Sequence, residues 1–198
     1  MTDKKLFKIV ARHTRSPSSI WREELVELLG AKPRRLSQWC ELGLWGLIHC
    51  VHSDIDQKIR SDAIIRVISQ ASTKNATERA LAQSIDFPPM PFTFMQSQPG
   101  QFFSALANVF EWRGDAQVMT LSNLGLDLGL SLRSIGEPCL LGVVDDTPRL
   151  CSFWLSLLPT DHLVRPELEQ FDSLSSLFDL PVSAQYLCID SRNNLFYC

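Results

Sequence analysis

Residues 116–130, AQVMTLSNLGLDLGL, decide how the rest of the chain is interpreted. The first seven residues, 116–122, form a short apolar run directly after Arg113-Gly114-Asp115, a combination typical of a turn, and they predict a buried strand. The polar pair Ser122-Asn123 ends that strand. The leucines and two glycines that follow predict a helix, and the glycines allow its backbone to lie close to a sheet.

A strand that ends at a polar break and turns directly into a helix is where many α/β enzymes hold a nucleophile. The break exposes a side chain beside the N–H groups of the first helical turn. Here that position carries Ser122 and no cysteine. The simplest interpretation is that Ser122 ends the strand or caps the helix, because an activated serine needs a base and the sequence assigns none.

On the N-terminal side of this stretch, strand-like and helix-like patterns alternate. Apolar runs predict strands at 6–11 and 63–69. Helical spacing predicts helices at 20–29, with Gly30 as the stop, and at 35–49, with Ser37 as a candidate cap. The second helix is so apolar that we expect it to be buried on most of its circumference. The capping box Asn75-Ala-Thr-Glu78 predicts a helix to about Ser84, and a further helix is expected over 100–111.

On the C-terminal side, apolar runs predict strands at 138–146, 150–157, 185–190 and 194–198, with a short helix near 168–177. The alternation of strands and helices indicates an α/β protein with a mixed sheet covered by helices. We expect residues 1–198 to form a single domain, because the Pro and Ser clusters are too short for a linker.

Composition narrows the possible partners and the location. A chain of 198 residues with 45% hydrophobic content can bury a core. Its 19 basic and 22 acidic residues give a net charge of −3, which argues against a nucleic-acid or anionic-membrane surface. The start MTDKKLFKIV has no apolar leader-like region and no stretch reaches membrane-spanning length, so we expect a cytoplasmic protein with no membrane span.

The cysteines and histidines give no sign of a metal site or a disulfide framework. The six cysteines follow no framework spacing and are interpreted as small buried hydrophobic residues in a reducing compartment: Cys40, Cys50, Cys139, Cys151, Cys188 and Cys198. His49-Cys50-Val51-His52 could chelate a metal, but no second pair at ligand spacing supports it. We therefore predict no metal and no other cofactor.

The order of motifs over residues 87–146 resembles the first half of a β-ketoacyl synthase. In order along the chain, these are the Pro-rich segment FPPMPFTFMQSQPGQ, an apolar helix, Arg113-Gly114, the strand VMTLS, the Gly/Leu helix, Gly136-Glu137 and the strand PCLLGVVDD. The chain length and the segment RRLSQWCELGL are closer still to the small ketosynthase-like chain length factors of aryl polyene pathways. The resemblance covers residues 32–146 and implies a thiolase-like fold, of which this chain is roughly half.

The resemblance also implies a role without catalysis. It places the ketosynthase cysteine in the window Leu121, Ser122, Asn123, Leu124 and Gly125, which contains no cysteine. The two histidines of decarboxylative condensation lie in a second half that has no counterpart here. The implied function is a catalytically inactive subunit that pairs with an active β-ketoacyl synthase and helps to set acyl or polyene chain length. It would meet the acyl carrier protein indirectly, through the complex. Lys32-Pro33-Arg34-Arg35 is either a solvated turn or a contact for such an acidic partner.

In the same family, the strand at 117–122 pairs antiparallel with its counterpart in the second subunit, and the Pro-rich segment lines the interface and the adjacent acyl tunnel. An apolar edge strand without a partner would invite aggregation. The implied tunnel and interface residues are Met90, Phe92, Phe94, Met95, Gln96, Gln98, Phe102, Phe103, Val118, Met119 and Leu121. Either Gln96 or Gln98 corresponds to the family's asparagine. Alternatively, Phe92 and Phe94 fill the core of the chain itself.

Two other functions stay open at this point. One is a small free-standing acyl hydrolase or thioesterase that uses Cys50 or Cys139 with His49, His52 or His162. No G-x-S-x-G elbow, phosphate loop or paired metal-ligand motif supports it. The other is a structural module with no acyl role.

Overall fold

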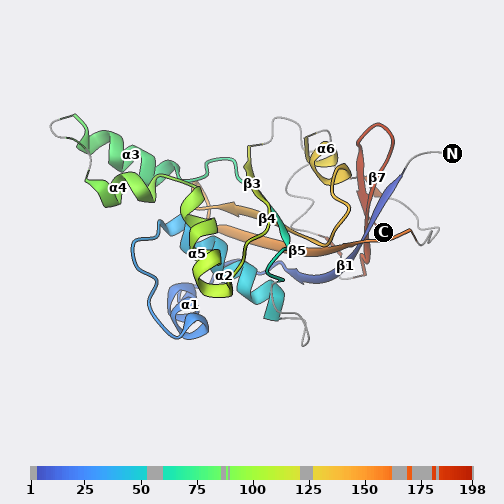
Figure 1. Cartoon of the computed structure of the whole chain (residues 1–198), viewed down its shortest axis with the longest axis horizontal. Coiled ribbons are helices and arrows are strands. Elements are labelled where there is room, and N and C mark those ends of the chain that lie inside the picture. Colours follow the sequence, from blue (N-terminus) through green and yellow to red (C-terminus); the bar gives the residue numbers. More distant parts are fainter. Residues whose placement is uncertain are drawn as a thin grey trace.

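The computed structural model describes residues 4–52, 60–85, 88, 90–120, 127–161, 169–170, 180–181 and 183–197. Figure 1 shows the course of the chain. The strands are β1 (Lys5–His13), β2 (Ile64–Ile68), β3 (Ala116–Met119), β4 (Cys139–Asp145), β5 (Cys151–Pro159), β6 (Glu169–Gln170), β7 (Tyr186–Ile189) and β8 (Leu195–Tyr197). The helices are α1 (Trp21–Leu29), α2 (Gln38–His52), α3 (Lys74–Gln83), α4 (Pro91–Gln96), α5 (Gly100–Phe110) and α6 (Gly129–Arg133).

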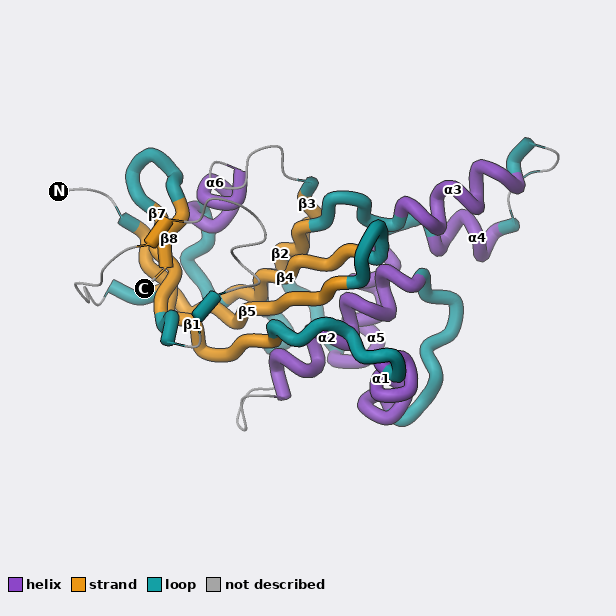
Figure 2. The backbone as a smooth tube through the Cα atoms, turned by 180° about the vertical axis from the view of Figure 1, so that it is seen from behind, coloured by secondary structure: helices purple, strands orange, loops and turns teal. Residues whose placement is uncertain are grey.

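The described strands form one mixed sheet in the order β3-β2-β4-β5-β1-β7-β8-β6. Strand β2 is parallel to both β3 and β4, and the other pairs are antiparallel. Helices α1, α2 and α5 gather on one face of the sheet, and α6 lies on the other (Figure 2). Because β3 is last in this order, one end of the sheet is a short parallel strand.

Strand β4 separates two hydrophobic clusters because successive side chains point to opposite faces of a sheet. Leu140 and Val144 belong to the cluster beneath α1, α2 and α5, whereas Leu141 and Val143 belong to the cluster on the α6 side. All seven residues of β4 are buried. The first six of them, 139–144, are apolar, as expected for a strand covered on both faces.

Helix α2 lies against the sheet at the indole of Trp154, which is fully buried. A Cβ atom at Gly46 would lie 2.8 Å from that indole, and one at Gly142 would lie 2.6 Å from it. Gly43 faces the ring of Phe102 in the same way, at 2.9 Å. The glycines therefore make room for large aromatic side chains between helix and sheet. The prediction that this helix is buried on most of its circumference is confirmed.

Helices α3 and α4 pack on each other and project beyond the sheet (Figures 1 and 2). Ala76 and Ala80 are the buried residues of α3, and α4 has none. At the base of this projection, the hydroxyl of Thr73 donates to the carbonyl of Ser97 at 2.5 Å. We call α3 and α4 together the arm.

Most of the predicted elements are present. The strands expected at 6–11, 63–69, 138–146, 150–157, 185–190 and 194–198 correspond to β1, β2, β4, β5, β7 and β8. Gly30 ends α1 in a left-handed conformation, with φ of 68°. The hydroxyl of Ser37 accepts a hydrogen bond from the N–H of Cys40 at 3.2 Å, so it caps α2 as expected.

Four details differ from the sequence-based expectation. Helix α2 begins at Gln38, three residues later than expected, and β3 ends at Met119. The capping box is wrong, because α3 already begins at Lys74 and the Asn75 amide donates to the hydroxyl of Thr147 at 2.5 Å. In the expected helix at 168–177, Glu169–Gln170 is strand β6, and 171–179 lie outside the described residues.

Candidate functional site

The open edge of β3 is the first candidate. In the described part of the chain, β3 pairs with β2 alone. The carbonyl of Asp115 accepts from the N–H of Ile65 at 2.8 Å, and that of Met119 accepts from Ser69 at 3.0 Å. Since backbone polar groups alternate in direction along a strand, the odd-numbered residues bond to β2 and the even-numbered ones face away. The N–H and C=O groups of Ala116 and Val118 are therefore directed at the open edge.

The Arg113-Gly114 turn sets the position of this strand. A Cβ atom at Gly114 would collide with the carbonyl oxygen of Ala63, so glycine is required for the close approach of the turn to β2. The indole N–H of Trp112 donates to the same carbonyl at 2.8 Å. Arg66 of β2 forms an ion pair with Asp115 at 2.6 Å. These contacts hold the start of β3 firmly on β2.

The side chains of β3 are only half-buried, apart from an exposed Gln117. Val118 packs against the helix-side cluster and Met119 against the opposite cluster. Backbone groups and side chains of this strand are thus available to a partner without unfolding. Leu121 and the rest of the predicted nucleophile window, Ser122, Asn123, Leu124 and Gly125, lie outside the described residues.

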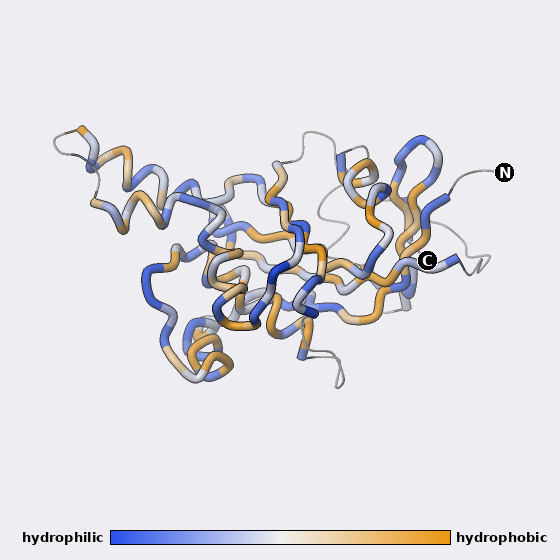
Figure 3. The backbone as a smooth tube through the Cα atoms, viewed as in Figure 1, coloured by the Kyte–Doolittle hydropathy of each residue, from blue (hydrophilic) through white to orange (hydrophobic). Residues whose placement is uncertain are grey.

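The second candidate is the apolar surface of the arm. The exposed fractions of its large apolar residues, and of Ile85 and Met90 beside it, are 63% for Leu81, 82% for Ile85, 62% for Met90, 45% for Phe92, 54% for Phe94 and 36% for Met95. Figure 3 shows hydrophobic residues along these projecting helices, away from the sheet. The alternative in which Phe92 and Phe94 fill the core of the chain is therefore wrong.

Contacts within the chain hold α4 beside the loop that precedes α2. The guanidinium of Arg35 lies over the ring of Phe92, 4.5 Å from its centroid. The Gln96 amide donates to the carbonyl of Leu36 at 3.2 Å, and the Gln98 amide donates to the hydroxyl of Ser97 at 3.2 Å. Gln96, one of the two candidates for the family's asparagine, is thus bonded to its own chain.

Phe102 and Phe103 differ from the residues of α4. Phe102 is fully buried, with its ring centroid 5.9 Å from those of Trp39 and Trp154. Phe103 is half-buried beside Trp112, at 6.0 Å. Because Phe102 lies in the core of its own chain, we remove it from the residues that face a partner.

The two candidate nucleophiles, Cys50 and Cys139, do not have the properties of reactive cysteines. Burial raises the pKa of the Cys50 and Cys139 thiols to about 12 in each case. A reactive cysteine needs a depressed thiol pKa and access to solvent. The Cys50 sulfur lies 3.6 Å from the carbonyl of Trp154, whereas His49 stacks on His13. His162 lies outside the described residues, and those described contain no group of three His, Cys, Asp or Glu side chains placed to hold a metal.

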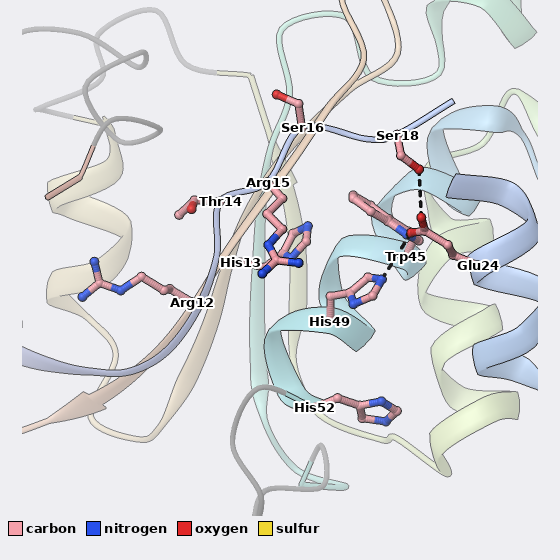
Figure 4. Close-up of a pocket in the computed structure, with 10 residues that line it drawn as sticks. All are labelled: Arg12, His13, Thr14, Arg15, Ser16, Ser18, Glu24, Trp45, His49 and His52. Carbon is pink, nitrogen blue, oxygen red and sulfur yellow. Dashed lines mark hydrogen bonds and ion pairs between the residues drawn. The ribbon is translucent and has the colours of Figure 1, made fainter. Parts of the chain in front are cut away.

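The sequence did not lead us to His13, the last residue of β1, which lines a pocket with His49 and His52 (Figure 4). Three of the four histidines of the chain meet there. The sequence does not predict this proximity, because His13 is far from the other two histidines along the chain. Only the pair His49 and His52, on one helix, could have been noticed from sequence.

The mixed sheet covered by helices is the α/β architecture that the sequence predicted. The same fold is found in a chain of the solved structure "Ketosynthase (ApeO) in Complex with its Chain Length Factor (ApeC) from Xenorhabdus doucetiae". The superposition has a TM-score of 0.53 and 13% sequence identity, and covers 98% of this chain and 96% of that one. The two chains are therefore of nearly equal length. No protein-family model and no curated protein matches the sequence. None of the helices in the described residues is long and apolar enough to cross a membrane.

Proposed function

We propose that this chain is a catalytically inactive, ketosynthase-like chain length factor. It forms a heterodimer with an active β-ketoacyl synthase and helps to set acyl or polyene chain length in aryl polyene-type biosynthesis in the cytoplasm. Residues 1–198 act as one domain in this proposal. The observation that carries it is the open edge of β3 in the described part of the chain, together with the exposed apolar residues of the arm.

Both surfaces favour a protein partner. An open strand edge offers unpaired N–H and C=O groups to another strand, and natural proteins usually cover or interrupt such an edge. A patch of exposed phenylalanine and methionine side chains is typical of a protein interface. The structural neighbour comes from a complex of a ketosynthase with its chain length factor, so assembly of this kind occurs among proteins of the fold.

The lack of a cysteine in the window where the family holds its nucleophile supports a non-catalytic role for this chain. Residues 121–125, where the family resemblance places the ketosynthase cysteine, read Leu-Ser-Asn-Leu-Gly. Cys50 and Cys139 have raised thiol pKa values of about 12 and cannot replace it. In this proposal the partner supplies the cysteine and both histidines, and contact with the acyl carrier protein is made through the complex.

Chain length would be set sterically by the arm. Phe92, Phe94 and Met95 of α4, and Met90 directly before it, have a third or more of their surface exposed, so they can close the far end of an acyl tunnel in the partner. An added methylene pair that does not fit a packed wall costs roughly 1–3 kcal/mol, which is enough to stop elongation.

The experiment is an elongation assay with this chain, with each ketosynthase encoded in the same genome, and with the two co-expressed. We expect elongation only when both chains are present, and longer products when Phe94 and Met95 are replaced by alanine. A ketosynthase variant that lacks its cysteine is the control for background activity. Elongation by this chain alone would contradict the proposal that it is catalytically inactive. Unchanged product length in the alanine variants of Phe94 and Met95 would contradict the proposal that these residues close the acyl tunnel.

A further inference from the structure

A pocket of about 450 Å³ lies between the end of β1 and helices α1 and α2, remote in the sheet order from β3 (Figure 4). Ten residues line it: Arg12, His13, Thr14, Arg15, Ser16, Ser18, Glu24, Trp45, His49 and His52. The pocket is independent of the proposed partner surface and of the proposed function.

An aromatic cluster forms the floor of the pocket. The ring of His13 lies nearly parallel to that of His49, with centroids 5.2 Å apart and an interplanar angle of 15°. The indole of Trp45 meets both imidazoles edge-on, at 4.7 Å from His13 and 5.0 Å from His49. Glu24 is fixed beside them, because its carboxylate accepts from the Trp45 indole at 2.9 Å and from the Ser18 hydroxyl at 2.8 Å.

Two imidazole nitrogens in this cluster lack a hydrogen bond. The Nε2 atoms of His13 and His49 are both buried and have no hydrogen-bond partner among the described residues. His13 is only 6% exposed, and the nearest carboxylate oxygen to His49 Nε2, on Glu24, is 3.7 Å away. Buried polar atoms are nearly always bonded, so two such atoms in one pocket wall indicate a missing ligand or solvent group.

Charges of both signs lie near these nitrogens: the Glu24 carboxylate raises the pKa of each ring, and the exposed guanidinium of Arg15 lowers it. Burial is the main cause that lowers the pKa of His13, to about 4, and it also lowers the pKa of His49, so burial favours the neutral form of both rings. A neutral imidazole carries one N–H donor. Arg15 also lowers both pKa values, which places its positive charge near the pair. Arg15 is exposed and makes no hydrogen bond or ion pair with a described residue. Arg12, in contrast, donates to the carbonyls of Pro181 and Ala184.

We propose that this pocket binds a phosphate group, either as free phosphate or as a phosphate monoester, through the Arg15 guanidinium and the Nε2–H groups of His13 and His49. A tetrahedral oxyanion has enough acceptors for a guanidinium and two further donors, and arginine is well suited to phosphate. The volume of the pocket is within the range of small-molecule sites and leaves space for an organic substituent.

Binding requires a small adjustment of the pocket wall. Both Nε2 atoms are shielded from solvent, and Arg15 is the long, exposed and unanchored side chain of the lining. The carboxylate of Glu24 opposes the anion, and it is already held by Trp45 and Ser18. We therefore expect a modest affinity that depends strongly on Arg15.

The test is a calorimetric titration of the full chain with inorganic phosphate and, separately, with phenyl phosphate, at constant ionic strength. Arg15→Gln should weaken binding at least about tenfold, as expected for loss of a charge-assisted contact. Arg34→Gln removes the same charge from an exposed loop outside the pocket and should leave binding unchanged. Tighter binding of phenyl phosphate would identify the ligand as a monoester, and equal binding would identify it as free phosphate.

A second measurement separates the imidazoles from the guanidinium. In nitrogen-detected NMR, added phosphate should shift the ring signals of His13 and His49, assigned with His13→Phe and His49→Gln. Saturable binding of neither anion would overturn the proposal. Equal effects of Arg15→Gln and Arg34→Gln, or an unchanged spectrum, would also overturn it.

Discussion

Helices α2 and α4 are both rich in large apolar side chains, yet only α2 is buried by its own chain. Helix α2 lies across the sheet, and Gly43 and Gly46 let it approach Phe102 and Trp154 closely. Helix α4 lies on the arm, away from the sheet, and none of its residues is buried. Apolar surface that is buried in the monomer stabilises the fold, whereas apolar surface left exposed can stabilise only an assembly.

The largest expected effect is on the α2 side of this comparison. Trp154→Ala should lower the free energy of unfolding by about 3–5 kcal/mol, because the indole fills the space between Gly46, Gly142 and Phe102. Urea denaturation followed by tryptophan fluorescence and circular dichroism measures it. A loss below about 1 kcal/mol would mean that α2 and the sheet are not packed as described.

The next largest effect is a pH dependence of the free energy of unfolding, caused by His13, which packs against residues of α2. The folded pKa of His13 is about 4, below the ordinary 6.5, because of burial. The unfolded chain therefore binds more protons between pH 4 and 6.5. The free energy of unfolding should fall as pH drops through this window, by at most about 3 kcal/mol, and should show no contribution from His13 above that window.

His13→Phe keeps a ring at this position and should remove most of that dependence. His52→Gln changes an exposed histidine of the same pocket and serves as the control. Parallel pH profiles for the wild type and His13→Phe would show that His13 is not held neutral.

On the edge side, Val118→Pro should affect association more than folding. The N–H of Val118 points away from β2, so proline there removes a donor from the open edge and leaves the β2–β3 ladder intact. We expect the affinity for the ketosynthase to fall roughly 10-fold or more. Val118→Ala, which keeps the N–H, is the matched control in surface plasmon resonance. Equal affinity of the two variants would show that the edge does not pair with the partner.

The smallest expected effect is on α4. Phe94→Ala should weaken ketosynthase binding about tenfold and leave the free energy of unfolding within about 0.5 kcal/mol of wild type, because its ring is 54% exposed. Phe102→Ala, in the core, should show the opposite pattern. If Phe94→Ala destabilised the monomer as much as Phe102→Ala, the distinction between the two helices would fail.

The features that were predictable from sequence are those with a local cause. The apolar run at 139–144 predicts a strand, Gly30 marks a helix end, and Ser37 is recognisable as a cap. The capping box at Asn75 failed because a tertiary contact with Thr147, far away in sequence, takes the side chain that would have capped the helix.

Long-range contacts also explain what the sequence could not show about the candidate sites. The composition of α4 does not reveal whether Phe92 and Phe94 face the core or solvent, since only the placement of the arm decides it. The pocket at His13 depends on the meeting of β1, α1 and α2, and no spacing in the sequence records that. The family resemblance places Phe102 among the tunnel and interface residues, together with the aromatic residues of α4. Phe102 lies on α5 and is buried in the core instead.

Hydrogen–deuterium exchange of this chain, alone and with the proposed ketosynthase partner, tests most directly whether the β3 edge is the partner surface. We predict that amides at 116–120 and 90–96 become protected in the complex, whereas those of α2 are already protected in the free chain. Unchanged exchange at 116–120 in a complex that demonstrably forms would contradict the proposed interface.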